Sequence, residues 1–182
     1  MKIAFVCPAS LPATQFGGIM FLCVNISKKL SNIGHNLTIY TTNLDFANNT
    51  NTFNKKLPKN EKVENFIIKR TNVWFSIFLF FVNPGMYKQM MKDEFDIIHA
   101  VGIRSFQAFI AAVISKRKKI PLVISDQGGL TTHPDLKESS FGKKVLIRLQ
   151  QPLIKLIVNQ SSSVIVPNEY EKKIFLNFCD ES

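Results

Sequence analysis

The sequence predicts a doubly wound α/β domain, with a mostly parallel sheet and helices on both faces. Three observations predict this fold. Short, continuous apolar runs of the kind that form strands covered on both faces alternate with longer segments whose apolar residues recur every three or four positions. Glycine, proline and asparagine separate these segments. With 182 residues, the chain is long enough for a single domain with a sizeable core, and we expect one domain over 1–182.

The first unit of the chain is predicted as a strand, a helix and a second strand. Residues 2–7 (KIAFVC) form a continuous apolar run, and residues 36–42 (NLTIYTT) form the next strand. Between them, apolar side chains from Gly18 to Ile33 lie on one helical stripe. Gly34 then suits the left-handed position that follows a helix. This order predicts a right-handed βαβ unit.

The next segment is less regular. Residues 43–62 are polar and rich in Asn, Thr and Lys, which predicts an exposed loop before a strand at 63–70. The aromatic run VWFSIFLFFV at 73–82 has two interpretations, a buried strand or helix and a segment that touches a membrane. It is about half the roughly 20 residues of a spanning helix, so we expect no transmembrane segment. Asn83 can cap a helix that starts at Pro84.

The rest of the chain repeats the alternation of strands and helices. Three further strands are expected, at 95–101, 120–125 and 162–167. Three helices are expected, at 105–118, 141–159 and 168–178, with Pro152 as a kink or break in the second. We find no internal repeat.

Composition narrows the class of protein. The 46% hydrophobic content is that of a globular chain. The formal net charge of +10 favours anionic partners, which are nucleic acid, phosphate-bearing ligands or an acidic membrane surface. The three cysteines are scattered and lack the CxxC spacing of a zinc site, which favours a reducing compartment. The short apolar run before Pro8 lacks the pattern of a signal peptide.

Ligands of such sheets bind at the carboxyl ends of the strands, so the loops after Cys7, Val101 and Ser125 are the candidates. The first loop contains Gly17 and Gly18 directly before a helix. The pair allows a backbone to approach a ligand and leaves N–H groups for an anion, or it serves only a tight turn. The loop lacks the GxGxxG pattern of dinucleotide sites.

The other two loops carry polar side chains. His99 lies near a strand end and is interpreted either as a proton-transfer group or as a buried, hydrogen-bonded histidine. Arg104 begins the next helix, where its charge opposes the helix dipole. It is interpreted as the partner of a ligand or a carboxylate, or as a solvent-exposed side chain, which is more common. Asp126, Gln127 and Gly128 follow the strand at 120–125. They suit a hydroxyl-rich ligand, or Asp126 only caps a turn.

Four segments resemble the N-terminal domain of family-4-type (group 1) glycosyltransferases in order and spacing, and together they cover nearly the whole chain. They are MKIAFVCP…GGIMFLCVNISKKLSNIGHNLTIYTT, FDIIHAVGIRSFQAFIAA, IPLVISDQGGL and SSVIVPNEYEKKIF. The resemblance implies two Rossmann-like domains that face a cleft (the GT-B arrangement), of which this chain is the acceptor-side domain. It also implies a metal-independent, retaining transfer from a nucleotide-sugar, with no cofactor.

The resemblance also implies roles for individual residues. Gly17 and Gly18 would approach the donor phosphates. His99 matches the first histidine of the family's HxH element and is the tentative catalytic residue, while Val101 stands in place of the second. Arg104, Asp126, Gln127 and Gly128 would line the acceptor and sugar site. Gln127 stands where the family often has a histidine, and a glutamine cannot titrate.

We therefore expect the N-terminal half of a glycosyltransferase that acts on a hydroxyl acceptor, a glycan or a lipid-linked one. No two glutamates of the chain are eight positions apart, so the family's Glu pair is missing and we expect no activity from this chain alone. The alternative is a non-catalytic module that binds a partner chain or a membrane surface. Nucleic-acid binding is not expected, because the sequence shows no interleaving of basic and aromatic residues that would support it. The expected location is cytoplasmic, with peripheral attachment to the inner face of a membrane left open.

Overall fold

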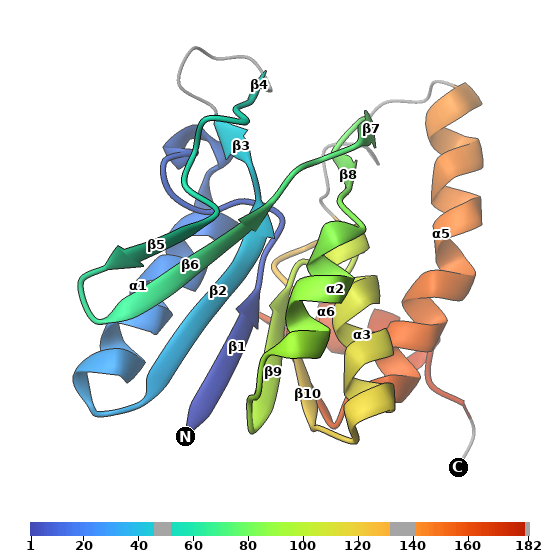
Figure 1. The fold of residues 1–182 in the computed structure, drawn as a ribbon. Coiled ribbons are helices and arrows are strands. Elements are labelled where there is room, and N and C mark those ends of the chain that lie inside the picture. Colours follow the sequence, from blue (N-terminus) through green and yellow to red (C-terminus); the bar gives the residue numbers. More distant parts are fainter. Residues whose placement is uncertain (46–51, 132–140, 181–182) are drawn as a thin grey trace.

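The computed structural model describes residues 1–45, 52–131 and 141–180, which form a seven-stranded sheet with helices on both faces (Figure 1). The strands of this sheet are β1 (Lys2–Val6), β2 (Asn36–Thr42), β5 (Asn60–Val63), β6 (Phe66–Thr71), β9 (Ile97–Val101), β10 (Leu122–Ser125) and β11 (Ser163–Ile165). The helices are α1 (Gly18–Asn32), α2 (Gly85–Lys92), α3 (Phe106–Lys118), α5 (Phe141–Gln160) and α6 (Glu169–Leu176), and a short 3-10 turn η1 spans Thr14–Phe16.

The strand order confirms the doubly wound fold. Across the sheet the order is β11-β10-β9-β1-β2-β6-β5, and every neighbouring pair is parallel except β5 with β6. The six parallel strands, numbered along the chain, therefore have the order 3-2-1-4-5-6 of Rossmann folds. The chain reverses its direction of winding between β1 and β9. In such sheets the crevice at this switch point is where ligands bind.

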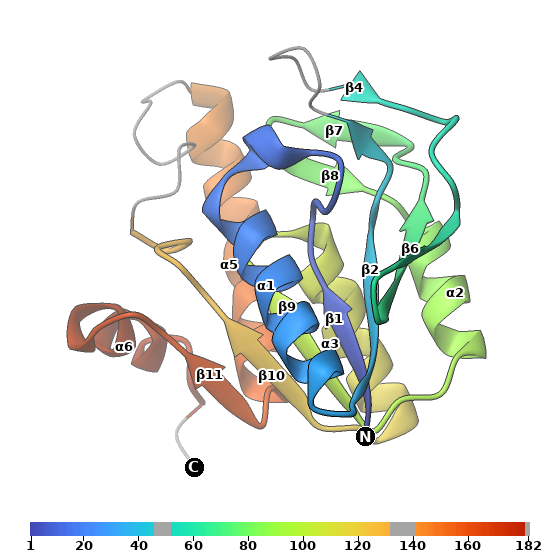
Figure 2. The same ribbon diagram turned by 90° about the vertical axis from the view of Figure 1, so that its left-hand side faces the viewer.

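Helices cover the two faces unequally (Figure 2). Helix α1 packs over β2 and β6 on one face, while α2, α3 and α5 form a layer on the other. The larger hydrophobic core lies beneath this layer and includes Ile98, Ala111 and Ile157. The smaller core lies under α1 and includes Phe5 and Cys23. Both faces of β1 are therefore buried, as its continuous apolar run predicts.

The predicted helices and parallel strands are present, with ends that differ by a few residues. Pro152 lies inside one continuous helix, α5, so the predicted break is excluded. Asn83 does not cap α2 with its side chain. Its side chain is buried and joins two other elements, because Nδ2 donates to Thr71 Oγ1 at 2.8 Å and Oδ1 accepts from Gln107 Nε2 at 2.6 Å.

Two predictions for the segment between β2 and α2 need correction. Residues 43–62 are not simply an exposed loop, because they contain the two-stranded pair β3 (Leu44–Asp45) and β4 (Thr52–Phe53) and the edge strand β5. The run at 73–82 is not a single buried element. It is a hairpin of β7 (Phe75–Ile77) and β8 (Phe80–Val82), in which all three residues of β7 are exposed while Phe81 is fully buried.

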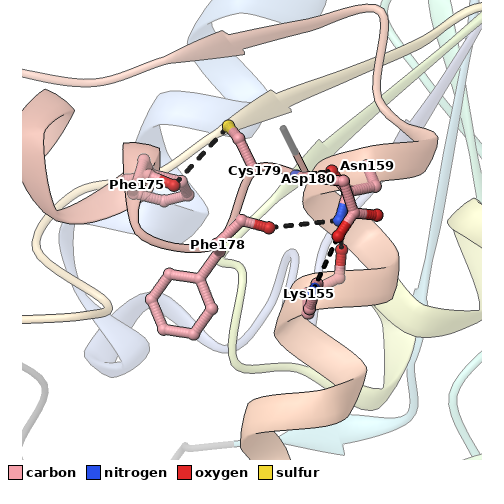
Figure 3. A network of polar contacts seen from close by, with 6 residues as sticks. All are labelled: Lys155, Asn159, Phe175, Phe178, Cys179 and Asp180. Atoms are coloured by element: carbon pink, nitrogen blue, oxygen red, sulfur yellow. Dashed lines mark hydrogen bonds and ion pairs between the residues drawn. The ribbon is translucent and has the colours of Figure 1, made fainter. Parts of the chain in front are cut away.

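The segment after α6 is fastened to the end of α5 by polar contacts (Figure 3). Asn159 donates to the carbonyl of Phe178 at 3.1 Å and accepts from the N–H of Asp180 at 2.8 Å. Lys155 forms an ion pair with Asp180 at 2.7 Å. Beside this network, between α3 and α5, lies a hollow of about 590 Å³. It is near the amino ends of the strands, away from the switch point, so its size alone does not make it the candidate site.

Candidate functional site

Two small hollows lie at the carboxyl ends of the central strands, next to the switch point. One has a volume of about 380 Å³, and its lining includes Gly18 and Gln127. The other has a volume of about 40 Å³, and its lining includes Arg104 and Asp126. Phe16 and the first turn of α1 contribute to both. The fold therefore brings together the three loops that the sequence singled out.

The glycine pair forms the entrance to α1. Gly17 has a φ of +90°, which is easily adopted only by glycine, and it is the N-cap of the helix without a side-chain capping bond. Gly18 is the first residue of α1. A Cβ at either position would have open space around it. The first-turn N–H groups of a helix have no partner within the helix, so this entrance offers backbone donors and the positive end of the helix dipole to an anion.

Asp126 holds the loop after β10 in place. Its side chain is 1% exposed, and its carboxylate accepts from the N–H of Ile103 at 3.1 Å and from that of Gly129 at 2.7 Å. Burial raises its pKa, and the two backbone hydrogen bonds oppose that shift. A Cβ at Gly129 would lie 2.5 Å from Oδ1 of Asp126, so no side chain fits there. The contacts favour the turn-capping interpretation of Asp126.

Arg104 joins that same loop to α5. Its Nε donates to the carbonyl of Gly129 at 2.6 Å, and its Nη1 donates to Oε1 of Gln150 at 2.7 Å. Gln150 is 7% exposed, so this contact is largely shielded from water. Arg104 therefore bonds a carbonyl and a side-chain amide of the protein, and its predicted contact with a ligand or a carboxylate stays a prediction. Gly128, with a φ of +80°, is buried at the centre of the turn, whereas Gln127 is exposed.

His99 points to the face of the sheet that α1 partly covers. Its Nε2 lies 2.6 Å from Oγ of Ser125, and its ring packs against Phe5 with the centroids 4.6 Å apart. Burial lowers the pKa of His99 to about 4, so the ring is neutral at pH 7. His99 is not among the described residues that line either hollow. Its catalytic role stays a prediction, and the contacts favour the alternative of a buried, hydrogen-bonded histidine.

Comparison with known sequences decides the family. Residues 16–180 match Glycosyltransferase Family 4, which is most of the chain. The chain belongs to that family. No curated protein matches it. Among solved structures, the crystal structure of Acinetobacter baumannii MurG is similar, with a TM-score of 0.48 and 14% identity over 92% of this chain. The match covers 42% of the MurG chain, so this chain spans less than half of that protein's length.

Sequence reasoning missed the apolar part of the site in this family 4 domain. Phe16, Ile19 and Leu22 line the larger hollow with the predicted polar groups, and Leu79 reaches the smaller one from the β7–β8 hairpin. From the sequence, Ile19 and Leu22 belong only to the apolar stripe of the predicted helix. The apolar Phe16, directly before the glycine pair, is the sequence feature that could have indicated this apolar lining. Gln150 is 46 positions from Arg104, so no local pattern joins them.

No three or more His, Cys, Asp or Glu side chains in the described ranges are placed to hold a metal ion together. Within the same ranges, none of the helices combines the length and the apolar character needed to cross a membrane.

Proposed function

We propose that this chain is the acceptor-side half of a retaining glycosyltransferase, which transfers a sugar from a nucleotide-sugar to a hydroxyl group of a glycan or a lipid-linked acceptor. Membership of the family supports sugar transfer. The observation that carries the rest is the open entrance of α1 at the switch point, where Gly18 lines the larger hollow and a Cβ at Gly17 or Gly18 would meet no other atom. We propose no metal and no further cofactor for the reaction.

The electrostatics of this entrance suit the donor phosphates. Helix α1 has no acidic residue in its first turn, so no carboxylate there competes with a bound anion for the N–H groups of the helix. The backbone at Gly17 and Gly18 carries no Cβ that would keep a phosphate away. The site approaches a phosphate from one side only, which fits a donor held mainly by a second domain. For that reason we propose that this chain alone has no turnover.

The polar residues of the site then divide into two groups. Gln127 is exposed beside Gly18, and its amide can donate to and accept from sugar hydroxyls. Arg104, Asp126 and Gly128 shape the loop that presents Gln127, through the contacts of Gly129 described above. The hollow of about 40 Å³ beside them is too small for a sugar ring, so a sugar would occupy the larger one.

Binding of inorganic pyrophosphate to the isotope-labelled chain tests the phosphate site. We expect the amide signals of Gly17, Gly18 and Ile19 to shift in an NMR titration. Gly18→Asp places a carboxylate at the helix entrance, in open space, and should weaken this binding several-fold. Asn25→Asp is the matched control, because it makes the same charge change at an exposed position of α1.

Other results would overturn parts of the proposal. Pyrophosphate shifts confined to the exposed lysines, with Gly18 and Ile19 unchanged, would mean that the net charge of +10 and not the helix entrance attracts the anion. Equal weakening by Gly18→Asp and Asn25→Asp would mean the same. Turnover of any nucleotide-sugar by this chain alone would contradict the proposal that it is half of a site.

One observation favours the alternative, a non-catalytic module that binds a partner chain. Helix α5 exposes Val145, Leu149 and Leu156, which are 41%, 65% and 45% accessible and lie at helical spacing along one side. Co-purification of this chain with a donor-domain chain, followed by a transfer assay, separates the two functions. A stable complex without turnover would favour the module.

A further inference from the structure

The β7–β8 hairpin exposes a cluster of large apolar side chains. Trp74 is 74% exposed, Phe75 54%, and Ile77 and Phe78 44% each. Single exposed apolar residues are ordinary, but four within five positions form a patch of the kind that marks an interaction site. The hairpin stands at the carboxyl end of the sheet, at the same end of the molecule as the first turns of α5 (Figure 1).

The hairpin is held firmly on its other side. Phe81 is fully buried and packs edge-to-face on Phe53, with the centroids 5.4 Å apart. Phe80 packs in the same way on Phe106 of α3 at 6.1 Å. The exposed side chains of β7 are therefore carried by an anchored element and are not the result of a frayed end.

The charges next to the hairpin are positive. Lys59 lines a shallow hollow together with Trp74, and Lys55 and Lys56 are exposed on the same connection. Two acidic side chains of the adjoining segments are paired, because Glu61 forms an ion pair with Arg70 at 2.6 Å and Asp45 accepts from Asn54 at 2.9 Å. Residues 73–82 contain no charged residue at all.

We propose that this hairpin inserts into the surface of a membrane that contains anionic lipids. Tryptophan and phenylalanine side chains are favoured at the boundary between headgroups and acyl chains. Lysines beside them add attraction to anionic headgroups, in keeping with the net charge of +10. A protein partner would match the apolar cluster equally well, but the cations around it and the lack of charge within it favour a lipid surface.

Insertion would also orient the candidate site. Leu79, at the turn side of β8, lines the smaller hollow, so the hairpin and the candidate site share one edge of the molecule. A docked domain would hold that edge next to the bilayer, where a lipid-linked hydroxyl acceptor would lie. This orientation rests on the proposed function, whereas the docking itself does not depend on any sugar transfer.

The chain contains a single tryptophan, Trp74, so its fluorescence reports on the hairpin directly. We expect vesicles of equimolar phosphatidylglycerol and phosphatidylcholine, at low salt, to shift the emission to shorter wavelength and to protect it from acrylamide. Vesicles of phosphatidylcholine alone should have a much smaller effect. High salt should reduce the effect of the anionic vesicles, because it screens the lysines.

Variants distinguish vesicle binding by the hairpin from nonspecific adsorption through other exposed apolar side chains. The double variant Phe75→Ser and Ile77→Ser keeps the reporter and should reduce sedimentation with anionic vesicles at least several-fold. The matched control is Ile33→Ser with Leu176→Ser, which removes two apolar side chains that are 71% and 59% exposed elsewhere. Circular dichroism of each variant shows that it is folded.

The lysines are tested in the same way. Lys55→Gln, Lys56→Gln and Lys59→Gln together should weaken vesicle binding more than the same change at the exposed Lys116, Lys119 and Lys173. A Trp74 that stays open to acrylamide with anionic vesicles would overturn the proposal. So would equal losses in the hairpin variants and their controls, or burial of Trp74 only when a second protein domain is added. Intact vesicle binding without pyrophosphate binding would leave this proposal standing and reject the phosphate site.

Discussion

His99 shows how a single buried group makes the stability of the fold depend on pH. Its pKa is lowered by burial to about 4 from 6.5, so between these values the unfolded chain takes up a proton that the folded chain does not. Stability is therefore retained above pH 6.5 and is lost as the pH falls toward 4. At pH 5 the loss amounts to about 2 kcal/mol.

The measurement is the free energy of unfolding by urea at pH 7 and pH 5. In His99→Gln the amide can keep the hydrogen bond to Ser125, and the difference between the two pH values should shrink by about 2 kcal/mol. His35→Gln is the control, since His35 is not buried. An unchanged pH difference in His99→Gln would show that its ring is not held neutral by burial.

For individual residues, the sequence predicted where the site residues lie better than what their side chains do. Gly17 was predicted at the helix entrance, and its positive φ confirms that glycine is needed there. The sequence allows both a turn-capping and a ligand-binding interpretation of Asp126, and the distances to the N–H groups of Ile103 and Gly129 favour the first. The bond from Arg104 to Gln150 was unpredictable, because the packing of α5 on α3 brings these residues together.

Among the elements, the hairpin depends on one buried amide of α3. Nε2 of Gln107 donates to the carbonyl of Phe81 at 2.8 Å and to Oδ1 of Asn83 at 2.6 Å, and Gln107 is fully buried. Gln107→Ala leaves both acceptors without this donor and opens a cavity, which should cost about 2–4 kcal/mol of stability. The readout is the midpoint and slope of a urea unfolding curve.

The control for Gln107→Ala is the same substitution of a glutamine on the surface of the molecule. Gln151→Ala, at an exposed position of α5, should change the free energy of unfolding by less than about 0.5 kcal/mol. Comparable effects of the two changes would mean that the Gln107 amide does not hold the hairpin.

The hairpin is also where element prediction was weakest. The run at 73–82 has no glycine, and its turn places Phe78 at a φ of +51°, a conformation that aromatic residues rarely adopt. No local turn signal therefore marked it. The anchoring of Phe80 and Phe81 by α3 and β4 selects the hairpin, and these are contacts between distant parts of the chain.

For the whole molecule, the alternation of strands and helices was enough to predict the sheet. Right-handed crossovers leave few ways to order six parallel strands, and the observed order is one of them. The antiparallel edge strand β5 was missed because its sequence, NEKV, has a single apolar residue and therefore no alternating pattern. An edge strand needs little burial, so it carries little apolar pattern.

The three cysteines allow a test of the molecule as one cooperative unit. Cys7 and Cys23 are fully buried in the core beneath α1, and the hydrogen bond of the Cys23 thiol to Cys7, together with burial, raises the pKa of Cys23. Cys179 is exposed after α6. Iodoacetamide should therefore modify Cys179 in the native chain at nearly the rate of an unfolded thiol, while Cys7 and Cys23 react only through opening of the core.

If that opening is global, urea should accelerate the modification of Cys7 and Cys23 equally, with the slope of the unfolding curve. Cys179→Ser leaves these two thiols as the only ones in the chain and serves as the matched variant. Modification of Cys23 at a rate that does not respond to low urea would instead show that α1 detaches from the sheet by itself. Such local opening would contradict a fold in which α1 and the central strands form a single unit, and it would make the glycine entrance of α1 the mobile part of the site.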